Sequence, residues 1–92
     1  MDNQDQLINA GNDCEALLKS EPFTRVINGL TEGAFQRFVN SKPEDKEERD
    51  HTYYHYRALV DVVNTLRQQV AVRDEIIAKE QEEQSDNREE EA

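Results

Sequence analysis

Residues 56–77, YRALVDVVNTLRQQVAVRDEII, hold the pattern that decides the fold of this chain. Apolar side chains recur there in alternating steps of three and four residues over three heptads, and Arg73 takes the one polar position. Branched Val and Ile at the a positions with Leu at the d positions are typical of helices that pack along a seam. Further apolar side chains widen the stripe, which favours a packed bundle over a bare two-stranded coiled coil. The seam comprises Tyr56, Leu59, Val63, Leu66, Val70 and Ile77, and it is widened by Val60, Val62 and Ile76.

The helix that carries this seam is predicted to begin near Pro43. Ser41 and Glu44 have the spacing of a capping box, and proline is favoured in a first helical turn. Because no glycine or proline follows, the helix is predicted over residues 43–79, on the order of 55 Å at 1.5 Å per residue. Residues 80–92 contain seven acids, one base and no large apolar side chain, so we expect a partly disordered acidic tail there.

A second helix is predicted over residues 22–40, where apolar residues recur at helical spacing. Pro22 suits its first position and disfavours helix at the residue before it. Gly29 and Gly33 lie four residues apart within this stretch. We interpret them as the place where a neighbouring helix of the same chain crosses closely.

The N-terminal stretch carries a weaker helical signal. Residues 13–20 are predicted to form a short first helix, with Asp13 as its N-cap. Gly11 and Asn12 are poor helix formers, so residues 1–12 are expected to be frayed.

Composition sets the outer bounds. The chain has 92 residues, a net charge of −10, 35% hydrophobic residues and no tryptophan, which limits it to one domain. No apolar run approaches the roughly 20 residues of a membrane span. Cys14 is the only cysteine, which excludes an internal disulfide, and we expect it to pack in the interior. Two prolines and three glycines are too few for an all-β fold. The predicted fold is all-α, a single domain over residues 13–79 that forms a helical hairpin or three-helix unit with a long C-terminal helix.

The lengths of the predicted helices do not match. The second helix spans about 30 Å and can cover only part of the seam on a third helix nearly twice as long. The far end of the seam is then free for self-association or partner binding, unless the first helix covers it. The predicted interface consists of Leu59, Val63, Leu66, Val70, Val72, Ile76 and Ile77.

Residues that could carry chemistry are few. His51 and His55 have the spacing of a helical metal pair, but Thr52 stands where a metalloprotease signature has glutamate. We interpret them as part of a solvated helix face and predict no metal, cofactor or small-molecule substrate. Tyr54 and His55 face outward and are candidates for a surface contact. Without a glycine-rich loop, paired cysteines or a nucleophile arrangement, the chain is not expected to be an enzyme.

Residues 17–66 resemble a family of small helical proteins that tailed bacteriophages encode near virion and DNA-packaging genes. The resemblance lies in Leu17-Leu18-Lys-Ser-Glu-Pro22-Phe23, Leu30, Phe38, Pro43-Glu44-Asp45, Glu48-Arg49, Arg57-Ala58-Leu59 and Leu66. It implies a phage origin and a role in the virion or its assembly, and it supplies no catalytic residues. The acidic, polar N-terminus does not resemble a secretory signal, so we expect the host cytoplasm or the virion as the location.

These observations lead to a non-enzymatic phage interaction protein, in virion assembly or DNA packaging, that binds a protein partner or a second copy through helix–helix contacts. An alternative is an acidic inhibitor that mimics DNA and occupies a host nucleic-acid-binding enzyme or defence complex. Most of the excess acid lies in residues 80–92, which weakens that alternative. Membrane association is not expected. Nucleic-acid binding is disfavoured, because acids surround the basic residues that could provide it, namely Arg25, Arg37, Lys42 and Lys46.

Overall fold

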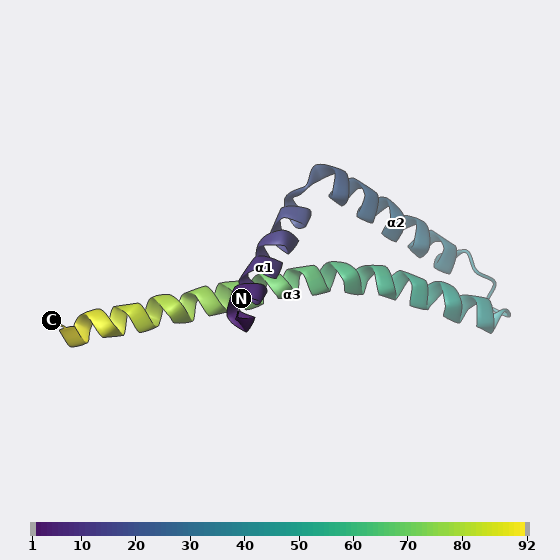
Figure 1. The fold of residues 1–92 in the computed structure, drawn as a ribbon. Coiled ribbons are helices and arrows are strands. Elements are labelled where there is room, and N and C mark those ends of the chain that lie inside the picture. The colour runs from purple at the N-terminus through teal and green to yellow at the C-terminus, as the bar shows by residue number, and fades with distance from the viewer. Residues whose placement is uncertain (1, 92) are drawn as a thin grey trace.

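The computed structural model describes the backbone of residues 2–91 and the side chains of residues 2–85. Within that range the chain forms three helices and no strand (Figure 1): α1, Asn3–Lys19; α2, Glu21–Val39; and α3, Lys46–Glu91. The two shorter helices form a V that packs on the long one. The predicted all-α fold with a long C-terminal helix is confirmed.

α1 begins at Asn3, so the expectation that residues 1–12 are frayed is wrong for residues 3–12. Met1 lies outside the described residues. The carboxylate of Asp2 accepts a hydrogen bond from the Asp5 N–H at 2.8 Å and caps the helix. Gly11 does not break the helix because it packs closely against α3. The cap at Asp2 and the packing at Gly11 together outweigh the low helix propensity of glycine.

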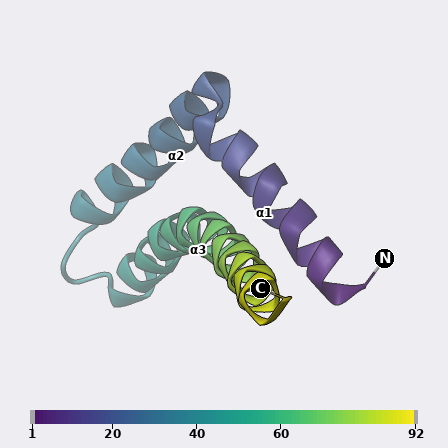
Figure 2. The ribbon, with the colours of Figure 1, turned by 90° about the vertical axis from the view of Figure 1, so that its left-hand side faces the viewer.

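A single residue separates α1 from α2. The Ser20 N–H donates to the Leu17 carbonyl and closes α1, while the Ser20 hydroxyl accepts from the Phe23 N–H at 3.3 Å and opens α2. Pro22 lies in the first turn but is the second residue of α2, and Glu21, where helix was disfavoured, is already helical. One extended residue turns the chain sharply, and α1 and α2 therefore diverge from this point (Figure 2).

α3 begins at Lys46, later than the predicted Pro43. Its cap is Asp45, whose carboxylate accepts from the Glu48 N–H at 3.1 Å. The expected capping box at Ser41 does not form, because the Ser41 hydroxyl donates to the Phe38 carbonyl at 2.6 Å and closes α2 instead.

α3 continues through Glu91, so residues 80–91 extend the helix and the expected separate, partly disordered tail is wrong for this part of the chain. Glu, Gln, Lys and Ala are strong helix formers, and no glycine or proline stops the helix. Ala92 lies outside the described residues. The C-terminal part of α3 projects beyond the two shorter helices (Figure 1), and the molecule measures 71 × 27 × 22 Å.

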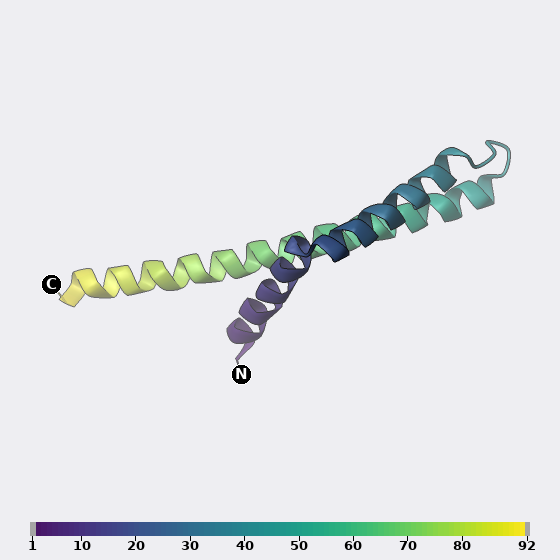
Figure 3. The same cartoon turned by 90° about the horizontal axis from the view of Figure 1, so that it is seen from above.

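α2 runs antiparallel along the N-terminal half of α3 (Figures 1 and 3). Two aromatic pairs join them: Phe35 with Tyr56 at a centroid distance of 5.6 Å and Phe38 with Tyr53 at 5.7 Å. Ala34 is 1% exposed, and its small side chain lets the two helices approach.

This architecture buries few side chains. Among the described residues only Gly11 and Ala34 are fully buried. The accessible surface is 7234 Å², whereas a globular chain of 10.7 kDa exposes about 5,500 Å². The radius of gyration is 20.0 Å, against about 12 Å for a compact chain of this length. The chain is therefore elongated and has a very small core of its own.

Candidate functional site

The seam residues lie against other helices of the same chain. α1 crosses α3 at Gln69 and Arg73, and it therefore covers the far end of the seam. This is the arrangement that the sequence left open as the alternative to a free interface. That these side chains also contact a partner stays a prediction. Each predicted interface residue is half-buried: Leu59, Val63, Leu66, Val70, Val72, Ile76 and Ile77.

Arg73, the polar position of the seam, holds α1 and α3 together. Its side chain is 12% exposed and donates to the Asn12 side-chain carbonyl at 2.9 Å. It also forms an ion pair with Glu15 across the two helices and with the adjacent Asp74 at 2.9 Å. The sequence marks Arg73 as an exception in an apolar pattern, but its partners on α1 could not be predicted from that pattern.

The electrostatics follow from this network. Lys19, one turn along α1, and Arg73, from α3, both contact the Glu15 carboxylate and hold its pKa below the ordinary value. The carboxylates of Glu15 and Asp74 in turn raise the pKa of Arg73. Each charge therefore stabilises its partners in the ionised form.

Gly11 is the residue at which two helices cross closely. A Cβ placed there would overlap the Cβ of Arg73 and lie 3.0 Å from the backbone oxygen of Gln69. A Cβ at Gly29 or Gly33 would meet nothing within 4 Å, so the predicted crossing at those two glycines is wrong. α1 crosses α3 rather than α2, and both α2 glycines lie on a side that no helix of the chain covers.

That side of α2 is also apolar. Val26 is 61% exposed and Leu30 is 51% exposed, and helical geometry places them on the same side as the two glycines. We call Val26, Gly29, Leu30 and Gly33 the α2 free face. The sequence showed these apolar residues only as part of the helical spacing of residues 22–40, because periodicity identifies an apolar stripe without showing which part of the stripe a neighbour covers.

The charges differ among the helices. α2 contains two acids and two bases and is neutral, whereas the sequence of α3 contains thirteen acids and seven bases. α1 contains three acids and one base. The free apolar face thus lies on the one helix of the described chain that carries no net charge.

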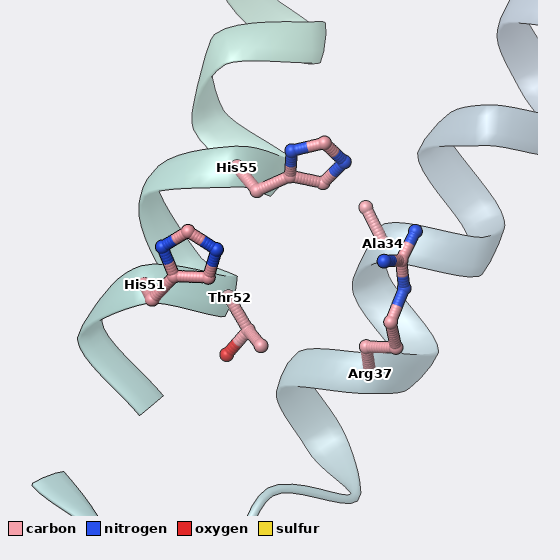
Figure 4. Close-up of a pocket in the computed structure, with 5 residues that line it drawn as sticks. All are labelled: Ala34, Arg37, His51, Thr52 and His55. Atoms are coloured by element: carbon pink, nitrogen blue, oxygen red, sulfur yellow. The ribbon is translucent and has the colours of Figure 1, made fainter. Parts of the chain in front are cut away.

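A cavity of about 120 Å³ lies between α2 and α3 (Figure 4). It is lined by Ala34 and Arg37 from α2 and by His51, Thr52 and His55 from α3. Within the described residues, no three or more His, Cys, Asp or Glu side chains are grouped to hold a metal ion.

The two residues predicted as a surface contact have different surroundings. Tyr54 is 68% exposed and its ring lies 5.6 Å from that of Tyr53, whereas His55 lines the cavity. Cys14, expected in the interior, is half-buried.

No described helix combines the length and the apolar character that crossing a membrane requires. No protein-family model, curated protein or solved structure matches the chain. The resemblance to phage proteins stays a prediction.

Proposed function

We propose that this chain is a non-enzymatic interaction protein that pairs with a second copy of itself through the α2 free face. The observation that carries the proposal is the exposed apolar surface of a chain with almost no core. Nine large hydrophobic side chains of the described residues are exposed: Leu7, Leu17, Val26, Leu30, Phe35, Val39, Tyr53, Tyr54 and Val62.

The surface areas support an association. The chain exposes about 1,700 Å² more than a compact protein of its mass, although the polar projecting end of α3 contributes part of that excess. A stable interface removes about 800 Å² from each partner. Burial of the apolar part of the excess against another chain supplies the hydrophobic stabilisation that three helices of this length do not gain from one another.

The charges favour a second copy at α2. Two acidic chains repel each other over most of their surfaces, but contact between two neutral helices brings no net charge together. In an antiparallel pair, the Glu21 and Arg25 end of one α2 lies beside the Glu32 and Arg37 end of the other, and each end is neutral. The glycines lower the surface so that the second helix can approach closely. Such a pair has the two-fold symmetry that is commonest among oligomers.

The biological role is proposed on the resemblance of residues 17–66 alone. We propose that the pair acts in the assembly of a tailed-phage virion or in the packaging of its DNA, in the host cytoplasm or within the virion. In that setting the pair presents two projecting α3 ends to further protein partners.

A specific feature favours the alternative of an acidic inhibitor. The backbone of α3 is helical through Glu91, so the seven acids of residues 80–91 form an array along a helical backbone. Such an array can compete with DNA for a basic groove. Deletion of residues 80–92 tests this alternative. If the shortened chain inhibits a nucleic-acid-binding enzyme as strongly as the full chain does, the alternative is wrong.

Sedimentation equilibrium tests the pairing. We expect the wild-type chain to form a dimer and Leu30→Glu to be monomeric, because the substitution places a charge at the centre of the α2 free face. Val39→Glu is the matched control, since Val39 is 55% exposed on the same helix and nine positions away, on the opposite side. The proposal is overturned by a monomeric wild-type chain, or by equal loss of association in both variants.

A further inference from the structure

The cavity between α2 and α3 brings three nitrogen-bearing side chains together. His51 and His55 lie one turn apart on the same side of α3, and Arg37 faces them from α2. Figure 4 shows the His55 ring extending toward α2, with the Arg37 guanidinium beside Ala34 at the opposite wall. We call Arg37, His51 and His55 the Arg–His pocket.

Within the described residues, no carboxylate lies within 4.0 Å of a nitrogen of the Arg–His pocket. Three nitrogen-bearing side chains are therefore grouped around the cavity without an ion pair to any described residue.

Among the described residues, the other polar groups around the cavity place no acidic side chain in its lining. The Thr52 hydroxyl donates to the Arg49 carbonyl at 2.9 Å, so it can only accept within the cavity. From α3, Glu48 lines a neighbouring hollow of about 320 Å³ that also includes Arg37 and Thr52. From α2, Arg37 is the only ionisable side chain that lines either hollow.

We propose that the Arg–His pocket binds a small tetrahedral oxyanion of the phosphate or sulfate type. A guanidinium offers paired N–H donors that match two oxygens of such an anion, and each imidazole ring adds an N–H donor. The cavity, of about 120 Å³, has room for a small anion.

The chain contains only two histidines, and proton NMR of the imidazole rings therefore reports directly on the pocket. Sulfate is the probe, and we expect it to produce saturable shifts of both histidine signals. Chloride at matched ionic strength is expected to produce no saturable shift.

Arg37→Gln is expected to weaken sulfate binding about tenfold. Arg25→Gln is the matched control, since Arg25 lies on the same helix and pairs with Glu21 at 3.9 Å; this variant is expected to bind as the wild type does. Circular dichroism verifies that both variants fold. Linear shifts without saturation, or unchanged binding in Arg37→Gln, would each overturn the proposal. Because Arg25 and Arg37 both lie on α2, sedimentation of the same samples shows whether either substitution alters self-association.

Discussion

Gly11→Ala perturbs the closest contact between α1 and α3. The added methyl group would overlap the Cβ of Arg73 and would lie 3.0 Å from the Gln69 backbone oxygen and 3.1 Å from the Arg73 Cδ. Carbon atoms in favourable contact are about 3.5–4.0 Å apart. Rotation of a side chain cannot relieve this overlap, because a Cβ and a backbone oxygen move only with their helix. The two helices must therefore separate.

The expected loss of stability in Gly11→Ala is obtained by comparison with Gly33→Ala, where an added methyl group meets nothing within 4 Å. Both substitutions replace glycine by alanine inside a helix, so both gain about 1 kcal/mol of helix propensity. Gly11→Ala alone incurs the cost of overpacking, about 1–3 kcal/mol. The free energies of unfolding of the two variants are therefore expected to differ by about 1–3 kcal/mol, with Gly11→Ala the less stable.

Urea denaturation followed by circular dichroism measures this difference. For a small protein it corresponds to a shift of roughly 1 M or more in the urea midpoint. Because Gly33 belongs to the α2 free face, the curves are recorded at several chain concentrations and compared at the lowest, where association contributes least. If Gly11→Ala proves as stable as Gly33→Ala, the close crossing of α1 and α3 is refuted.

Two further substitutions test individual interactions. Asp45→Ala removes the cap of α3 and is expected to lower the free energy of unfolding by about 1 kcal/mol; Asp50→Ala, within the same helix, is the control in urea denaturation and should cost less. Glu15 has a lowered pKa in the folded chain, so its contribution is complete above its ordinary value of 4.5 and is lost as the pH falls through the lowered folded value. We therefore expect the stability of the wild type to decline more steeply below about pH 4.5 than that of Glu15→Gln, and parallel pH curves would contradict the ion pairs.

The sequence was sufficient for the two longer helices. The apolar spacing of residues 22–40 and 56–77 predicted helix in both places, and the structure has α2 and α3 there. Pro22 lies in the first turn of α2, one residue from the predicted first position, because proline acts through its own ring and missing N–H and needs no distant partner. The boundaries were less certain, since a hydroxyl such as that of Ser41 can close one helix or open the next.

The candidate sites were predictable only in part. The i, i+4 spacing of His51 and His55 placed them on one side of a helix, but nothing in the sequence indicated that Arg37 would face them. The same limit applies to the α2 free face. Val26 and Leu30 belong to the same apolar pattern as Ala34, and only the position of α3 separates the covered residue from the exposed ones.

The sequence by itself determined that residues 22–39 and 56–77 are helical, where the apolar seam lies and that the C-terminal end of the chain is strongly acidic. Each of these properties depends on residues within one or two turns of one another, and such local interactions can be derived from spacing and propensity. The tertiary structure alone decided which glycine lies at a helix crossing, which partners neutralise Arg73 and which apolar side chains stay exposed. These properties depend on the angle between α1 and α2, and the backbone of the one residue between them, Ser20, sets that angle.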